Sequence, residues 1–547
     1  MWLALTLNFR TCHERATRVD NETLSHSDQD VIVMKWAILW RSLILSTLGD
    51  TMYPYGRHLR MLDLRDLSNL LDELEESKRG KVVKYFFAGK MTQFHFLLPT
   101  TTKKGVTRLD RNKIVMAVGD EVTKMAPLLE GLSEPSTLDT LSAGLPDWAP
   151  RLSHLHELEL WDGKALGNET VRNLLRAHCP QLSQIRMHHC SNNDADNQLA
   201  ALINGLPSDT LTHFENLSSS GIGAETCLAL SGHGKSLVQL KLALDHDGVL
   251  ALAHLQRCTN LETLDVTGLR QSVDLKATEN DVYVQIIEWL RGCHKLREVN
   301  FENVLSAPDL LLPVLQNKDV HLLKLQVTGN DTSMYVVKDH HDFHRALALQ
   351  TGLESLQLYA DPDPTSRDDI EVLTDTFCSL KSLRELRLTR LSDYFSDQHI
   401  ALLAHQLPKL EVLNIGGYGI SDSVLDDLLV LSHLKSITFS GVTSFTTQGL
   451  LNFIDGLSDG NVGLTLVIWM ADQDSAISDQ NQGLIRSALS AKADGRFEYQ
   501  LLRGEPIHSV ASLRHSYDYS ATDEQQIPRT NMNKATVIEL KYTHRTL

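Results

Sequence analysis

The sequence predicts a right-handed α/β solenoid shaped like a horseshoe, with a parallel sheet on its concave face and helices on its convex face. Three observations lead to this prediction. A short apolar pattern, L-x-x-L-x-L, recurs along most of the chain. Each copy is followed by apolar residues at helical spacing, so the repeating unit is a strand, a turn and a helix. Neither half of a unit can bury its apolar side alone, so each unit needs a neighbour on both flanks.

One complete unit lies in residues 407–428, which read LPKLEVLNIGGYGISDSVLDDL. Leu410, Leu413 and Ile415 occupy the three apolar positions, which point into the core because side chains alternate along a strand. A Gly-Gly pair then predicts a turn, and apolar residues at helical spacing predict a helix over 420–428.

The same pattern repeats at a regular interval through the middle of the chain. Copies start at Leu155, Leu182, Leu211, Leu237, Leu261, Leu296, Leu322, Leu353, Leu383, Leu410 and Leu434. Successive starts are 24 to 35 residues apart, which is the period of leucine-rich repeats lengthened by full helices on the outer side. The longer intervals carry insertions near 271–280 and 329–342, which we expect to be loops at one rim. The chain is therefore predicted to be a leucine-rich-repeat solenoid.

Weaker copies precede the regular array. They start at Leu59, Met91 and Leu129, and a helix is predicted over 114–128 between the last two. Residues 31–48 are apolar near helical spacing, but two basic residues interrupt them. Basic residues are costly at the centre of a bilayer, so this stretch predicts an amphipathic helix that packs against the first repeat.

Three regions follow from this pattern. Residues 1–56 are expected to be an N-terminal helical segment, and residues 57–503 the solenoid with a C-terminal cap. The cap should contain a helix near 450–457, a strand near 464–469, a helix near 478–489 and a strand at 497–502. Residues 504–547 are polar and lack periodicity, and such a composition cannot offset the entropy of ordering, so we expect a mostly disordered tail.

Charge and cysteine content narrow the function classes. The formal net charge is −17, and the basic residues are scattered, which argues against a nucleic-acid partner because phosphate binding needs a basic stripe. The seven cysteines are dispersed and form no C-x-x-C pair, so we expect seven free thiols in a reducing compartment. The protein is therefore expected to be intracellular, in the cytoplasm, the nucleus or both, and not bound to a membrane.

Several segments resemble a known family. Cys179-Pro180 before Leu182, with Cys190 later in that repeat, resembles the cysteine-containing, RNI-like repeat subclass common in F-box proteins. Residues 39–67, 157–166, 305–315 and 420–428 together resemble filamentous-fungal F-box/leucine-rich-repeat proteins. The resemblance covers roughly residues 31–503.

The resemblance implies a substrate receptor of a Skp–cullin–F-box ubiquitin ligase. In such a receptor the repeats hold a client protein and an N-terminal F-box docks on the Skp-type adaptor. The residues before Leu59 contain no L-P-x-E-like start, so the F-box is expected to be missing or truncated. Two other classes stay open: a leucine-rich-repeat scaffold or GTPase-regulator-like protein without a ubiquitin link, and an enzyme with no recognisable motif.

The usual catalytic, cofactor and metal motifs do not occur in the sequence, and we expect none of these sites. His340, His341 and His344 have a spacing at which a helix can share a metal ion. A solvated helix N-terminus is the favoured interpretation, because the zinc-protease motif needs Glu where His341 stands. His188, His189 and Cys190 are also ligand types, but the two histidines should point to opposite sides of a strand.

The concave face is the remaining candidate site, and its side chains come from the outward strand positions. Seven residues are predicted to bind a protein client there: Trp161, Arg186, His188, Lys241, Asp265, Tyr359 and Arg387. Trp161 and Tyr359 are the expected anchors, because aromatic side chains supply much of the energy of protein interfaces. Arg186, Lys241 and Arg387 are expected to provide charge complementarity.

Overall fold

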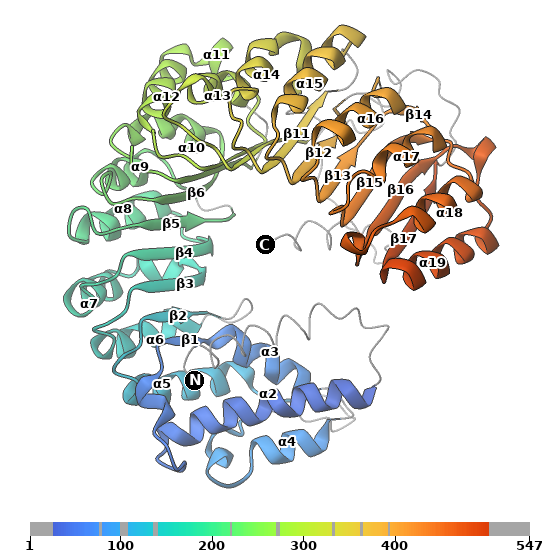
Figure 1. Ribbon diagram of the computed structural model, residues 1–547. Coiled ribbons are helices and arrows are strands. Elements are labelled where there is room, and N and C mark those ends of the chain that lie inside the picture. Colours follow the sequence, from blue (N-terminus) through green and yellow to red (C-terminus); the bar gives the residue numbers. More distant parts are fainter. Residues whose placement is uncertain are drawn as a thin grey trace, which may run out of the picture. The chain divides into compact units, whose positions relative to one another are not determined.

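The structure is a computed structural model that describes residues 26–75, 79–98, 108–134, 140–218, 221–269, 274–330, 334–361, 365–391 and 394–502. Within these ranges parallel strands form one continuous sheet, and helices line one side of it (Figure 1). The expected tail at 504–547 and Cys12 lie outside the described residues.

Seventeen strands belong to the sheet. They are β1 (Met61–Asp63), β2 (Gly131–Ser133), β3 (Glu157–Asp162), β4 (Gln184–His189), β5 (His213–Asn216), β6 (Gln239–Leu244), β7 (Thr263–Gly268), β8 (Glu298–Glu302), β9 (Lys324–Thr328), β10 (Tyr335–Val336), β11 (Ser355–Asp361), β12 (Glu385–Thr389), β13 (Val412–Ile415), β14 (Tyr418–Ile420), β15 (Ser436–Thr443), β16 (Thr465–Ala471) and β17 (Arg496–Leu501). Strands β1 to β9 pair in chain order, and the ladder continues through β11, β12, β13, β15, β16 and β17. The short strands β10 and β14 pair with β11 and β15.

The helices connect these strands. The α-helices are α2 (His26–Thr47), α3 (Leu64–Glu75), α4 (Gly80–Phe86), α5 (Arg111–Met125), α6 (Thr140–Trp148), α7 (Glu169–His178), α8 (Ala195–Gly205), α9 (Ala224–Ser231), α10 (His246–Ala251), α11 (Leu275–Thr278), α12 (Asn280–Gly292), α13 (Ala307–Gln316), α14 (His341–Leu347), α15 (Arg367–Ser379), α16 (Asp397–Gln406), α17 (Leu425–Leu428), α18 (Thr447–Gly456) and α19 (Asp479–Ala493). Short 3-10 turns are η1 (Tyr55–His58), η2 (Gly89–Phe94), η3 (Ala149–Arg151), η4 (Gly163–Gly167), η5 (Leu252–Leu255), η6 (Val337–Asp339), η7 (Asp422–Val424), η8 (Asp459–Asn461) and η9 (Gln473–Ser475).

The core follows from the predicted apolar positions. One row of side chains in register runs through every strand of the main ladder, and includes Leu62, Leu132, Leu158, Ile185, Phe214, Leu240, Leu264 and Leu413. All of these side chains are buried. Each repeat thus covers the apolar strand residues of its neighbours, which is how a solenoid builds a core without long-range closure. The chain is a leucine-rich-repeat solenoid, as its repeat spacing predicts.

The helix predicted over 31–48 is α2, and it packs against the first repeat. Trp36 and Trp40 lie one turn apart on its buried side. Both indole N–H groups donate to the same oxygen of Asp66 in α3, at 2.7 and 2.6 Å. A buried carboxylate needs such donors because burial removes its hydration. This contact fixes α2 to the start of the array.

The strand predicted near Met91 is wrong. Met91 and Phe94 belong to η2, and β1 pairs directly with β2. Both side chains are buried, because η2 packs against α2 and α5 rather than entering the sheet. Residues 64–130 therefore form one long connection between neighbouring strands.

The unit at 407–428 also differs from its prediction. Its helical part is η7 followed by the four-residue α17, and an extra strand, β14, occupies residues 418–420. Gly417 has φ of +147°, and a Cβ there would lie 2.5 Å from the Phe395 carbonyl oxygen. Glycine is therefore required where the chain turns into β14.

The cap elements α18, β16, α19 and β17 occur where the sequence predicts them.

Candidate functional site

The site predicted from the sequence lies on the sheet face that points away from the helices, here called the open face. Three rows of side chains in register form this face, and they pass through Glu157, Glu159 and Trp161 of β3. The middle row contains Asp63, Ser133, Glu159, Arg186, Glu215, Lys241, Asp265, Asn300, Gln326, Gln357, Arg387, Asn414 and Thr438. From Glu159 to Asp265 the charges in this row alternate in sign on five consecutive strands.

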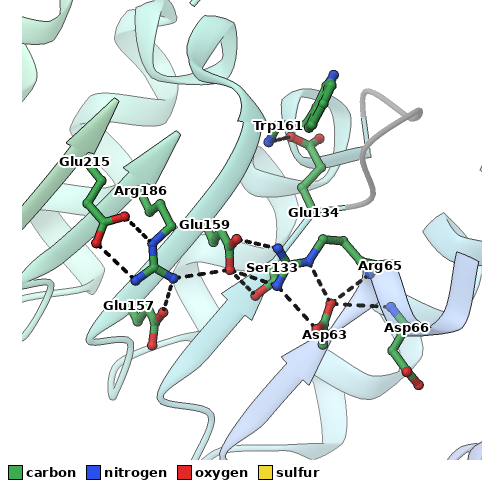
Figure 2. Close-up of polar contacts among 10 residues, drawn as sticks. All are labelled: Asp63, Arg65, Asp66, Ser133, Glu134, Glu157, Glu159, Trp161, Arg186 and Glu215. Atoms are coloured by element: carbon green, nitrogen blue, oxygen red, sulfur yellow. Dashed lines mark hydrogen bonds and ion pairs between the residues drawn. The ribbon is translucent and has the colours of Figure 1, made fainter. Parts of the chain in front are cut away.

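Arg186 is the centre of an ion-pair network on β3 to β5, shown in Figure 2. Its guanidinium binds Glu215 on β5 through two hydrogen bonds, with N–O distances of 2.8 and 3.3 Å. On β3 it lies 3.4 Å from a Glu157 oxygen and 3.6 Å from a Glu159 oxygen. Strands are about 4.8 Å apart, so an arginine in one strand reaches both neighbours. Burial would lower the pKa of Arg186, but these carboxylates, Glu215 first, raise it.

A second arginine extends the network toward the N-terminus (Figure 2). Arg65, which follows β1, contacts both oxygens of Glu159, one of them at 2.9 Å. Its Nε also lies 3.2 Å from Asp63. Burial alone would lower the pKa of Arg65, but Asp63 and Glu159 more than offset it and raise this pKa. Glu159 thus accepts two hydrogen bonds from Arg65 and a third from Ser133 at 3.2 Å, and it also forms an ion pair with Arg186.

Trp161 and His188, both half-buried, form an aromatic pair beside this network. Their ring centroids are 4.0 Å apart with an interplanar angle of 23°, so the rings stack. The backbone N–H of Trp161 donates to Glu134 at 3.0 Å (Figure 2). The other Glu134 oxygen accepts from the N–H of Leu141 at the start of α6, at 2.7 Å. This buried carboxylate holds the end of β3, and with it Trp161, in position.

Lys241 and Asp265 occupy neighbouring strands further along the middle row. Lys241 lies 4.0 Å from Glu215, which connects it to the Arg186 network. The amide of Asn300 donates to Asp265 at 2.8 Å. Burial raises the pKa of Asp265 above its usual value, more than the Asn300 hydrogen bond and the nearby lysines lower it.

Tyr359 and Arg387 form a third group on β11 and β12. The Tyr359 hydroxyl accepts a hydrogen bond from Arg390 at 3.0 Å. Arg387 lies 3.8 Å from Glu385. Trp161 and Tyr359 are seven strand spacings apart along the ladder, which corresponds to about 34 Å. The structure therefore brings the seven predicted residues together as three groups on one face, and a partner that contacts both anchors must span that distance.

The three candidate histidines near the 329–342 insertion do not converge on one point. The Nε2 of His340 lies 3.4 Å from Asp309 on α13, and the Nε2 of His341 lies 2.5 Å from Asp369 on α15. His344 is fully buried, and neither of its ring nitrogens has a hydrogen-bond partner. Within the described ranges, no three His, Cys, Asp or Glu side chains gather as metal ligands do.

Sequence reasoning missed Arg65, Glu134 and Glu215. Arg65 lies just past the weak first repeat, where the strand boundary is hard to place. Glu215 belongs to a degenerate repeat copy in which only Leu211 and Phe214 match the pattern. Glu215 directly follows the core residue Phe214, and because side chains alternate along a strand, the sequence could have placed Glu215 on the outward face. Glu134 occupies a core position, so its role was visible only in the structure.

Among the helices that the structure describes, none combines the length and the apolar content needed to cross a bilayer. A shallow hollow of about 380 Å³ lies on the helix side of the sheet, lined mainly by residues of α5 and α6. None of the seven predicted site residues lines it.

No protein-family model matches the chain, and no curated protein matches its sequence. A chain in the crystal structure of the Rad7 and Elc1 complex in yeast is similar over 87% of this chain and 96% of its own length, with 13% identity and a TM-score of 0.38. A chain in the crystal structure of the TLR13–ssRNA13 complex is similar over 69% of this chain, with 14% identity and a TM-score of 0.34. This chain spans 53% of that second one.

Proposed function

We propose that this chain is a non-enzymatic protein-binding module whose open face receives a client protein. One observation carries the proposal. Polar side chains stand in register on consecutive strands of one sheet face, and an aromatic pair, Trp161 and His188, lies among them. A polar surface with a few aromatic anchors is typical of protein interfaces, in which a small number of side chains provide most of the binding energy.

Within this class, we propose an F-box-type substrate receptor, or a remnant of one, in a Skp–cullin–F-box ubiquitin ligase. The support is the resemblance of residues 31–503 to fungal F-box/leucine-rich-repeat proteins. The client would bind the open face, and the Skp-type adaptor would bind the N-terminal helical segment that includes α2. The cullin would then be reached through the adaptor.

A leucine-rich-repeat scaffold or GTPase-regulator-like interaction protein without a ubiquitin link is the alternative. It uses the same open face and differs only at the N-terminal segment.

Co-purification with the adaptor separates the two. The full chain and a purified Skp-type adaptor are mixed and resolved by size-exclusion chromatography. A receptor co-elutes with the adaptor, and the Trp161→Ala variant should co-elute equally well because Trp161 lies on β3, outside the N-terminal segment that includes α2. A wild-type chain that elutes separately from the adaptor contradicts the ubiquitin link and leaves the scaffold function.

The client site is tested by truncating the two anchors. Trp161→Ala and Tyr359→Ala should each weaken binding of a client, and a fully desolvated anchor costs more than about 2 kcal/mol on truncation. Thermal unfolding of each variant checks that the repeat still folds. If affinity for the client survives both truncations, the anchor assignment is wrong and the insertions at 271–280 and 329–342 become the candidates.

A further inference from the structure

The open face has an uneven distribution of charge along the array. Among the described residues of its three rows, the part from β1 to β8, with Arg65 just after β1, carries seven carboxylates and three cations. The carboxylates are Asp63, Glu157, Glu159, Glu215, Asp265, Glu298 and Glu302, and the cations are Arg65, Arg186 and Lys241. The part from β9 to β17 carries Glu385 and Glu498 against Lys324, Arg387 and Arg496. The first part, here called the acidic half, is therefore negative, and the second is close to neutral.

The cations of the acidic half are already engaged. Arg186 contacts three carboxylates, Arg65 contacts Glu159 and Asp63, and Lys241 lies near Glu215. A negatively charged partner would have to displace these pairs while facing the excess carboxylates. A positively charged partner can instead form ion pairs with carboxylates that are still partly exposed to solvent, such as Asp63 and Glu298. Like charges in contact are costly, so the field of this half selects for a basic partner.

Trp161 gives the acidic half an anchor suited to the same chemistry. Its ring is half-buried and stacks on His188, and its backbone N–H donates to Glu134, so both ring and backbone have partners before any client arrives. Tryptophan is the best aromatic partner for a cation, and a guanidinium can stack on the ring while pairing with a carboxylate. Glu159 points to the same face of β3, two residues before Trp161.

We propose that the acidic half binds an extended polypeptide segment rich in Arg and Lys, with an arginine of that segment stacked on Trp161. The inference rests on the proposed protein-binding function and names the chemical class of its client. Eight strands span about 34 Å at the usual spacing. An extended segment of about ten residues covers that length.

Selection from a random peptide library tests the inference. Peptides of about ten residues, the length derived above, are displayed on phage and selected against the immobilised full chain. We expect enrichment of Arg and Lys and depletion of Asp and Glu. A selected basic peptide is then measured by fluorescence anisotropy, and its affinity should fall as salt is raised because salt screens exposed charges.

Two variants and one matched control locate the site. Trp161→Ala should weaken the basic peptide about tenfold, which corresponds to a cation–π contact of about 1.4 kcal/mol. Glu157→Gln should weaken it about threefold to fivefold, as for an exposed ion pair. Glu385→Gln is the control, because Glu385 occupies the same row on β12 and also lies beside an arginine. It should leave the affinity unchanged. Thermal unfolding confirms that each variant is folded.

The outcomes distinguish this inference from the proposed function. Selected peptides that are not basic, but whose binding falls on Trp161→Ala, overturn the charge inference and leave the protein-binding function standing. Retention of a single-stranded RNA that competes with the selected peptide also overturns it. Basic peptides that respond to Glu385→Gln but not to Glu157→Gln contradict the acidic half as the site. No enrichment of any peptide overturns the inference of an extended basic segment and leaves the protein-binding function to the client-binding test with the two anchor variants.

Discussion

Arg186 shows how a single residue can hold the open face together. The sequence marks it as an outward-facing cation available to a client. In the structure it binds carboxylates on both neighbouring strands, and one of them, Glu215, has only 4% of its side chain exposed. A buried carboxylate loses its hydration, so it depends on this arginine for compensation. Arg186 therefore stabilises the sheet face on which a client would bind.

Replacing Arg186 by Met should lower the free energy of unfolding by about 2 to 3 kcal/mol, because Glu215 stays buried without its bidentate partner. Adding Glu215→Gln should recover part of this loss, since the amide carries no charge to compensate. Urea unfolding of the two single variants and the double variant measures the coupling. If the loss of unfolding free energy in the double variant equals the sum of the losses in the two single variants, the ion-pair assignment is contradicted.

His344 is a residue whose environment opposes protonation. It is fully buried next to Tyr335 and Phe343. Burial is the main cause that lowers its pKa to about 3; the nearby His340 and His341 also lower this pKa, and Asp369 raises it by less. For His340, burial would lower the pKa, but its hydrogen bonds to Asp309 and to the Val336 carbonyl raise it above the usual value. On acidification, the contribution of His344 to folding stability therefore falls, whereas that of His340 rises.

Acidification should weaken this repeat through His344. In the unfolded chain His344 takes up a proton below about pH 6.5, whereas the folded chain resists protonation, so its contribution is lost as pH falls. Between pH 7 and pH 5 this loss is about 2 kcal/mol. His344→Leu should reduce the fall in the urea midpoint between these two pH values.

The matched variant is His340→Gln. The folded state binds the His340 proton more tightly, so its contribution is present below about pH 6.5 and is lost as pH rises through its raised pKa. Removing it should steepen the loss on acidification. The assignment of His344 fails if His344→Leu leaves the acid sensitivity unchanged.

At the scale of one element, each strand contributes to stability through its two neighbours. Leu413 of β13 is buried in register with Leu386 of β12 and Ile437 of β15. Val412 precedes it on the open face and is only half-buried. A nearest-neighbour array places the effect of a core deletion on that repeat and the two beside it.

Leu413→Ala should cost roughly 2 to 5 kcal/mol, the usual range for a buried leucine. Hydrogen exchange should rise first in β12, β13 and β15, and later near Leu155. Val412→Ala is the control and should cost less, because the half-buried Val412 side chain removes less apolar surface from water than the buried Leu413 does. A uniform loss of protection along the chain would contradict the nearest-neighbour picture.

At the scale of the whole molecule, the cysteines show how thoroughly the array buries its interior. The six in the described residues are unpaired, and five of them are buried. Burial raises the pKa of Cys179, Cys258 and Cys293 to about 12. A thiol with such a pKa is almost never a thiolate at neutral pH and so reacts slowly.

Thiol titration should therefore give two different counts. Under denaturing, non-reducing conditions, seven thiols should react, in agreement with the seven cysteines of the chain. In the native protein at pH 8 the five buried thiols should react far more slowly than Cys378, which is partly exposed. A denatured count below seven would indicate a disulfide and contradict the prediction.

The sequence alone was enough to determine the repeat, the main-ladder strands from Leu155 onward and the row of buried apolar side chains, but not the short strands β10 and β14. The reason is physical, since in a solenoid each unit contacts only its neighbours and local spacing therefore specifies tertiary contacts. The same reasoning placed Trp161, Arg186 and Lys241 on one face, because side chains alternate along a strand.

Only the tertiary structure decided which side chains on that face meet. Arg65 and Glu159 are 94 positions apart in the sequence, and they contact each other because residues 64–130 form one long connection between β1 and β2. The apolar pattern at Met91 is the same in a strand and in a turn packed against α2, so spacing alone could not exclude a strand there. Ion pairs and ring stacking depend on strand order and register across the sheet, and these are set by packing between segments that are distant in the sequence.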